Sequence, residues 1–199
     1  MFRFYYYSQK IHNRVSLSTR CAGDKMQIFI MRHGEAANIA GEDSFRPLTK
    51  QGLLEAEKMG LWLARSKLKL RHVFVSPYLR AQQTCISVTD ALTRATLVND
   101  IVPETLDFIT PSGNARQVHD FIDGLFQSDD SLIKDNCDDD NQAIIFVSHM
   151  PFVSYLVAEL TASFNTPIFS TGAIAMIDYD IEQMKGQLVD IVAPEKMNC

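Results

Sequence analysis

The chain has 199 residues, of which 46% are hydrophobic and 22% are charged, an ordinary composition for one globular domain. Its formal net charge of −5 excludes the global basic field that is typical of nucleic-acid-binding proteins, so any anion site has to be local. No run approaches the roughly 18 apolar residues of a membrane span, and the four cysteines form no C-x-x-C pair, which is typical of free thiols in a reducing cytoplasm.

Residues 1–25 differ in composition from the remainder of the chain. The segment Met1–Gly23 contains four basic residues and no acidic one, and it begins with a cluster of aromatic side chains. A targeting segment and a disordered, dispensable extension both fit this composition, whereas a secretory signal would need a continuous apolar stretch. We favour an extension or a mis-assigned start, because Met26 begins directly at the first convincing strand. The expected domain is therefore 26–199.

The first predicted strand covers 27–31, a short apolar run that ends in an Arg-His-Gly sequence at 32–34. Such a run is typical of a buried strand that delivers polar residues at its carboxyl end. A periodic stretch with leucine, methionine and tryptophan follows, and it predicts a helix over 49–64. Thr49 is a suitable N-cap for this helix.

The next predicted elements repeat the order of strand and helix. Residues 72–76 form a second buried apolar run, which Pro77 closes. Because proline is well suited to the first helical position, we expect a helix over 77–92. A third short strand is predicted over 97–102.

A helix is expected over 114–126, where apolar residues recur at helical spacing. The stretch 128–142 contains six acidic residues and one lysine, and it is predicted to be a solvated loop. It lacks the glycine hinge and terminal glutamate of a calcium loop. The run 143–147 is the clearest buried strand in the chain, and it ends in Ser148 and His149.

The last predicted elements are a helix over 151–160 and closing strands over 173–179 and 188–192. Because strands and helices alternate along the chain, the pattern predicts an α/β fold with a mostly parallel central sheet flanked by helices. Ligands of such sheets bind beyond the carboxyl ends of the strands. Polar residues follow three of the predicted strands, so we expect them to converge on one site.

The residues at these strand ends suit phosphoryl-transfer chemistry. Arg32 and Arg80 carry guanidinium forks that match the oxygens of a phosphate dianion. A neutral His33 imidazole between them can attack phosphorus, while His149 can donate to the equatorial oxygens as charge builds up. Gly34 leaves room where the backbone has to pass close to the ligand. The arrangement needs no metal or other cofactor, and the adjacent arginines would repel a cation.

Three motifs resemble those of the histidine phosphatase (phosphoglycerate mutase-like) superfamily. Residues 32–35 resemble its R-H-G-E signature, residues 76–84 resemble its S-P-x-x-R-A-x-Q-T segment, and residues 147–149 match the strand that carries its second histidine. The short chain, together with Phe-Arg-Pro-Leu-Thr at 45–49 and Ser-His-Met-Pro at 148–151, is most similar to the SixA-type phosphohistidine phosphatases. The resemblance runs from about Met26 to the 190s.

The resemblance implies a three-layer phosphoglycerate mutase-like fold and a phosphatase with His33 as nucleophile. It implies that Arg32, Arg80 and His149 complete the phosphate pocket, with Arg46 as an additional phosphate or substrate contact. The implied substrate is phosphohistidine on a protein, such as the histidine-phosphotransfer domain of a bacterial sensor kinase. We expect a monomer that binds neither nucleic acid nor membrane.

The sequence departs from the family pattern at two positions. Many members carry an acid that protonates the leaving oxygen, and Glu104 is the only candidate here, without the fuller mutase motif around it. A phosphohistidine substrate tolerates this, because its P–N bond is reactive, whereas an alkoxide leaving group needs general-acid help worth about 10²–10⁴ in rate. Met150 stands where many members have glycine, which fits a pocket mouth that meets a protein surface.

Two alternative functions remain open. The first is a small-molecule phosphomonoesterase or mutase of the same superfamily, although the chain lacks the longer insertions expected to enclose a sugar phosphate. The second is a non-catalytic phosphoprotein-binding module, in which the pocket holds phosphate without turnover. Hydrolysis assays on protein and small-molecule substrates distinguish all three.

Overall fold

The computed structural model describes residues 25–66, 69–96, 102–128 and 142–197, which form a six-stranded sheet in the order β3-β2-β4-β1-β5-β6. Strands β3, β2, β4 and β1 are parallel, while β5 is antiparallel to both β1 and β6. The strands are β1 (Lys25–Arg32), β2 (Lys69–Val75), β3 (Glu104–Thr105), β4 (Gln142–Ser148), β5 (Ile174–Asp180) and β6 (Lys185–Val192).

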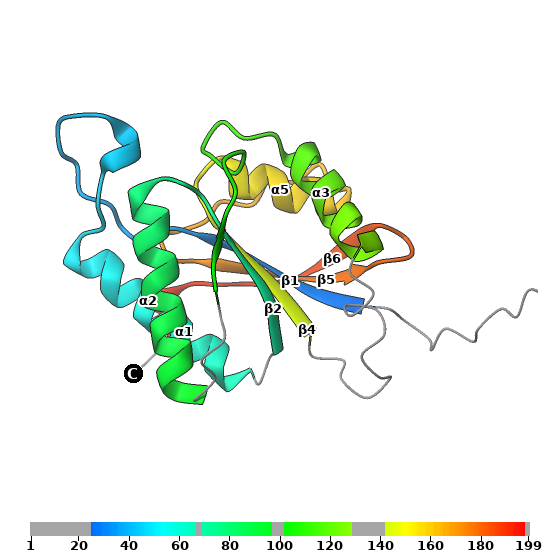
Figure 1. Ribbon diagram of the computed structural model, residues 1–199, viewed down its shortest axis with the longest axis horizontal. Helices are drawn as coiled ribbons and strands as arrows, with labels where there is room; N and C mark the ends of the chain where they lie inside the picture. The colour runs from blue at the N-terminus through cyan, green and yellow to red at the C-terminus, as the bar shows by residue number, and fades with distance from the viewer. Residues whose placement is uncertain (1–24, 67–68, 97–101, 129–141, 198–199) are drawn as a thin grey trace, which may run out of the picture.

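Helices cover both faces of this sheet, which gives three layers (Figure 1). Helices α1 and α2 lie on one face, and α3 and α5 lie on the other. The predicted α/β fold with a mostly parallel, helix-flanked sheet is therefore confirmed. The helices are α1 (Lys50–Arg65), α2 (Leu79–Thr96), α3 (Ala115–Ser128) and α5 (Phe152–Thr161), with 3-10 turns η1 (Asp43–Phe45) and η2 (Pro194–Lys196).

Strand β1 shows why the core sequences are continuously apolar. Its side chains alternate between two buried clusters: Ile28 and Ile30 pack with α3 and α5, while Phe29 and Met31 pack with α1 and α2. All four are fully buried. A strand covered on both faces has no polar face to display, so the alternation expected of a surface strand is absent.

Most predicted boundaries lie within a few residues of the observed ones, and Thr49 caps α1 by accepting a hydrogen bond from the Gly52 amide. The strand predicted over 97–102 is not observed at Val102, and residues 97–101 lie outside the described residues. The predictions for the extension and for the acidic loop likewise fall mostly outside them. Among the helices that the structure describes, none is both long and apolar enough to cross a membrane.

Candidate active site

The carboxyl ends of β1, β2 and β4 bring the predicted residues to one edge of the sheet. Because β1 and β4 are parallel and in register at Arg32 and Ser148, the residues that follow them lie side by side. The His33 amide donates to the Ser148 carbonyl at 2.9 Å. The rings of His33 and His149 have centroids 5.0 Å apart. The two histidines, 116 positions apart in the chain, therefore form one site.

The contacts of His33 define which ring nitrogen can react. Its Nδ1 lies 2.7 Å from the Gly34 carbonyl oxygen, an acceptor, so Nδ1 carries the hydrogen. Its Nε2 accepts a hydrogen bond from Nε of Arg80 at 3.2 Å. Burial lowers the pKa of His33 to about 4, and the charges of Arg80 and Arg32 lower it as well, against the Gly34 hydrogen bond. The imidazole is therefore neutral at physiological pH, with its lone pair on Nε2.

His149 is a second buried, neutral imidazole. Its Nε2 lies 2.7 Å from the Ser76 hydroxyl oxygen, whereas its Nδ1 is buried without a hydrogen-bond partner among the described residues. Burial above all, and then the neighbouring His33 and Arg80, lower the pKa of His149 to about 2. If the Ser76 hydroxyl donates to Nε2, the proton of His149 lies on Nδ1, where it is available to an oxyanion.

The side chain of Arg32, the last residue of β1, is held by the backbone of a segment distant in sequence. Its Nη1 donates to the Phe169 carbonyl at 2.6 Å, and its Nε is buried without a hydrogen-bond partner in the described part of the protein. Burial lowers the pKa of Arg32, and the nearby Glu55 carboxylate opposes this shift. Glu55 is only 7% exposed and accepts a hydrogen bond from the Glu35 amide at 2.9 Å. It supplies a countercharge to the partly buried guanidinium of Arg32.

Arg80 lies in the first turn of α2 and is only 4% exposed. A cation is unfavourable at a helix N-terminus, so a compensating anion is expected there. Asp43 provides it: its carbonyl accepts from Arg80 Nη1 at 2.6 Å, and its Oδ2 accepts from Nη2 at 2.9 Å. The guanidinium carbon also lies 5.0 Å from the centre of the Tyr78 ring. Arg80 is thus fixed between His33 and the loop that carries Asp43.

Arg46 reaches the site through the same loop. Its Nε donates to the Ala37 carbonyl at 2.9 Å, and its Nη1 donates to Oδ1 of Asp43 at 3.0 Å. Its charge contributes to the lowered pKa of His33. The structure therefore places Arg46 near His33 and, through Asp43, next to Arg80, and its contact with substrate stays a prediction.

Gly34 and Glu104 have surroundings that the sequence did not suggest. A Cβ on Gly34 would overlap the carbonyl oxygen of Gly52, so the glycine lets the loop pack against α1. The Glu104 carboxylate, on β3, lies 3.5 Å from Nδ1 of His72. The role of Glu104 as an acid stays a prediction, and this contact directs it toward β2.

Three positioning residues were missed by the sequence analysis: Asp43, Glu55 and Thr84. The Thr84 hydroxyl accepts from the Gly34 amide at 3.1 Å and donates to the Arg80 carbonyl at 2.7 Å, so it links the loop that follows His33 to α2. Its place in the second motif was a usable signal. Asp43 lies in a loop with no periodic pattern, and its only signal was its proximity to Arg46.

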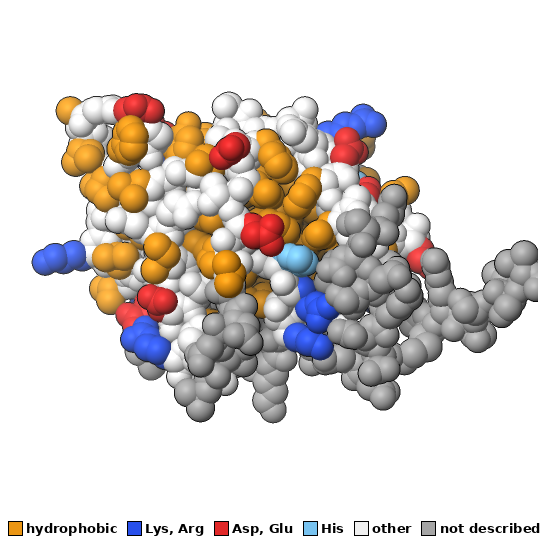
Figure 2. Space-filling view, viewed as in Figure 1, with side chains coloured by type: hydrophobic (Ala, Val, Ile, Leu, Met, Phe, Trp, Pro, Cys, Tyr) orange, Lys and Arg blue, Asp and Glu red, His pale blue; other side chains and the backbone are white. Residues whose placement is uncertain are grey.

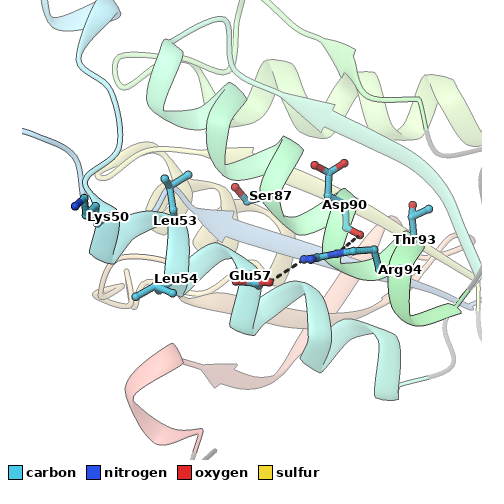
Figure 3. A pocket seen from close by; sticks show the side chains of 8 residues that line it. All are labelled: Lys50, Leu53, Leu54, Glu57, Ser87, Asp90, Thr93 and Arg94. Atoms are coloured by element: carbon cyan, nitrogen blue, oxygen red, sulfur yellow. Dashed lines mark hydrogen bonds and ion pairs between the residues drawn. The ribbon is translucent and has the colours of Figure 1, made fainter.

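A groove of about 710 Å³ lies elsewhere, between α1 and α2 (Figure 3). Its one described ion pair joins Arg94 to Glu57 at 2.8 Å, and no histidine lines it. The convergent groups at the strand ends and this groove are therefore separate features. The groove is lined by Lys50, Leu53, Leu54, Glu57, Ser87, Asp90, Thr93 and Arg94.

Comparisons with known proteins identify relatives of this chain. Residues 28–103 match the model of the histidine phosphatase superfamily (branch 1). The chain is 38% identical over 155 residues to phosphohistidine phosphatase SixA of Escherichia coli (strain K12), an alignment that covers 78% of this chain and 86% of that protein. It is 37% identical over 160 residues to the SixA homolog of Haemophilus influenzae, covering 78% and 89% of the two chains.

A solved structure, that of the protein histidine phosphatase SixA complexed with tungstate, has the same fold. The two superpose with a TM-score of 0.74 at 36% sequence identity, and the match covers 87% of this chain and all of that one. Both the sequence and the three-dimensional comparison therefore extend well beyond the motif segments.

Proposed function

Because the chain belongs to the histidine phosphatase superfamily, among the relatives of SixA, we propose that it hydrolyses phosphohistidine on a protein. The specific substrate that we propose is the histidine-phosphotransfer domain of a phosphorelay sensor kinase. The observation that carries the proposal is the neutral His33, whose Nε2 lone pair lies within hydrogen-bond distance of Arg80. A second neutral imidazole, His149, lies beside it.

In the first step, the Nε2 lone pair of His33 attacks phosphorus, and the P–N bond to the substrate imidazole breaks. The substrate nitrogen takes a proton from solvent, and the phosphoryl group is left on His33. Water then attacks this phosphohistidine, releasing inorganic phosphate and restoring the lone pair. Arg32 and Arg80 bind the phosphoryl oxygens, and Arg46 is an additional contact. A proton on Nδ1 of His149 stabilises the charge that builds up on an equatorial oxygen.

The buried polar atoms without partners support an oxyanion ligand. Arg32 Nε and His149 Nδ1 both lack a hydrogen-bond partner in the described residues, and buried donors of this kind are costly unless an acceptor binds them. A phosphoryl group supplies several such acceptors. We therefore expect tungstate and vanadate to inhibit competitively.

The surroundings of the pocket support a protein substrate. Phe45 is 67% exposed and directly precedes Arg46, while Ile168 is 87% exposed and directly precedes Phe169, whose carbonyl holds Arg32. Figure 2 shows hydrophobic side chains gathered over the loop that contains η1, at the upper left of the view. An apolar rim gains from burial against a protein surface and contributes little to binding a small hydrophilic phosphate ester.

The leaving group is consistent with this substrate class. Glu104 contacts His72, and a phosphohistidine substrate does not require a strong acid beside the departing nitrogen. Because sensor kinases use cytoplasmic nucleotide, the proposal also places the protein in the cytoplasm, where we expect it to act as a monomer.

The test is hydrolysis of a phosphorylated phosphotransfer domain, run beside a panel of small phosphomonoesters at matched concentration. We expect kcat/KM to favour the phosphoprotein and His33→Ala to abolish release of phosphate. The double variant Phe45→Ser/Ile168→Ser should lower kcat/KM for the protein and leave that for small esters unchanged. Preference for a small ester would assign the protein to metabolite phosphatases, and absence of turnover would indicate a binding module.

A further inference from the structure

Asp43 makes with the arginines the contacts expected of a bound phosphate. Its Oδ2 accepts from Nη2 of Arg80 at 2.9 Å, and its Oδ1 accepts from Nη1 of Arg46 at 3.0 Å. One carboxylate thereby bridges two guanidinium groups. Arginines bind a phosphoryl group in the same way, with its oxygens accepting hydrogen bonds from the guanidinium groups.

The same network extends to the nucleophile. Arg80 donates to both the carboxylate and the carbonyl of Asp43, and its Nε donates to Nε2 of His33 at 3.2 Å. The lone pair that has to attack phosphorus is thus engaged by a guanidinium that Asp43 holds in place. This hydrogen bond from Nε of Arg80 has to open before Nε2 of His33 can attack phosphorus.

Asp43 can act as an anion in this competition. Although burial opposes ionisation, the hydrogen bonds from Arg46 and Arg80 hold the pKa of the Asp43 carboxyl below its usual value. At neutral pH the group is therefore negatively charged, like the phosphoryl group that it would exclude. Two negative groups do not share the same pair of arginines without a cost in free energy.

The loop that carries Asp43 is fixed at its base and exposed at its tip. The base is closed by an isolated bridge between Ala36 and Leu48. Near the tip, the Asp43 side chain is 53% exposed, and Gly41 has a φ of +132° with open space around it. The carboxylate can therefore move into solvent without disturbing the buried layers beneath it.

We propose that Asp43 is an internal competitor for the phosphate pocket, a specificity-determining residue displaced by the substrate's phosphoryl group. Its displacement frees Nε2 of His33 for attack. A ligand that binds only through its oxyanion has to displace the carboxylate unaided, whereas a protein substrate adds contacts at the rim. Asp43 thus weakens binding of inorganic phosphate and small esters. The inference rests on the proposed function, because it requires that the pocket bind a phosphoryl group.

The test is isothermal titration of tungstate into the full-length wild-type protein, Asp43→Asn and Glu42→Gln. Glu42→Gln is the matched control, because it removes the same charge from the neighbouring position. The described side-chain contact of Glu42 is with the Ser44 hydroxyl at 2.6 Å and involves neither arginine. We expect Asp43→Asn to lower the Kd for tungstate about tenfold, and Glu42→Gln to change it less than twofold. The value of kcat/KM for a small phosphomonoester should rise in parallel.

Each outcome has a separate meaning. Equal or weaker tungstate binding by Asp43→Asn, with thermal unfolding unchanged, would show that Asp43 only positions the arginines, and the inference would fail. An equal gain in Glu42→Gln would reduce the effect to net charge and also overturn it. If tungstate binds to none of the three proteins, the proposed phosphate pocket itself is wrong. Asp43→Ser is titrated as a second variant, because the asparagine amide oxygen can still accept from one of the arginines whereas the shorter serine cannot span both.

Discussion

A buried polar cluster that contains histidine lies at each end of β1, and the two clusters differ in the groups that surround the histidine rings. At the carboxyl end, His33 and His149 lie among arginines. At the amino end, Met26 pairs with Tyr179, whose hydroxyl lies 2.8 Å from Nε2 of His119 on α3. Both clusters are largely buried, yet the ring nitrogens meet different kinds of partner in the two.

The neighbours of each ring explain the difference. Nε2 of His119 also lies 3.1 Å from the Met184 carbonyl, which can only accept, so this nitrogen carries a hydrogen and donates it. The Tyr179 hydroxyl in turn donates to Asp123 at 2.7 Å. Acceptors around His119 make it a structural link between elements. The donor beside Nε2 of His33 leaves a lone pair there, which is what a nucleophile requires.

The largest expected effect distinguishes the two clusters by activity. Replacing the proposed nucleophile, His33→Ala, should reduce kcat by about four orders of magnitude or more, because no other group can carry the phosphoryl intermediate. The matched variant His119→Ala should keep kcat within about twofold of wild type. Release of phosphate from a phosphorylated phosphotransfer domain measures kcat for both variants. Labelled phosphoenzyme, isolated without acid, shows whether the intermediate forms. Substantial turnover by His33→Ala would refute the assignment of the nucleophile.

The next effect separates the two nitrogens of His149. The side-chain amide of asparagine can place its nitrogen near the position of Nδ1, whereas that of glutamine reaches the position of Nε2. If Nδ1 donates to the transition state, His149→Gln should lower kcat about 10²–10³-fold, and His149→Asn should retain more activity. Steady-state kinetics on the phosphoprotein decides the order. The reverse order would transfer the donor role to Nε2 and make Ser76 a competitor for it.

How much of this could be predicted from sequence depended on local pattern. The strands that directly precede His33 and His149 are continuous apolar runs, so the fold and the convergence of the site followed from the alternation of elements. Asp43 could not be found in this way, because its contacts with Arg80 join a loop to a helix 37 positions away. The His119 cluster was missed for the same reason, since Tyr179 is 60 positions distant.

The third prediction concerns the dependence of stability on pH. Burial lowers the pKa of His33 to about 4, so below the ordinary value of 6.5 the unfolded chain binds a proton that the folded protein does not. The free energy of unfolding should therefore fall as pH decreases from 6.5 toward 4, by up to about 1.4 kcal/mol per pH unit for this group. Urea unfolding of wild type and His33→Asn at several pH values isolates the contribution. An unchanged slope in the variant would mean that His33 binds its proton equally well in the folded and the unfolded protein, so that its pKa is not lowered by folding.

The smallest effect belongs to the structural cluster and completes the contrast. Tyr179 is fully buried, and Tyr179→Phe removes the hydroxyl that accepts from His119 and donates to Asp123. Because both partners keep other polar neighbours, the variant should lose only about 1–2 kcal/mol of unfolding free energy. Urea unfolding measures this loss, and kcat should stay at the wild-type value, since the phenol lies at the opposite end of β1 from His33. A fall in kcat without a matching loss of stability would show that the two ends of the strand are coupled, and the division into a catalytic and a structural histidine cluster would no longer hold.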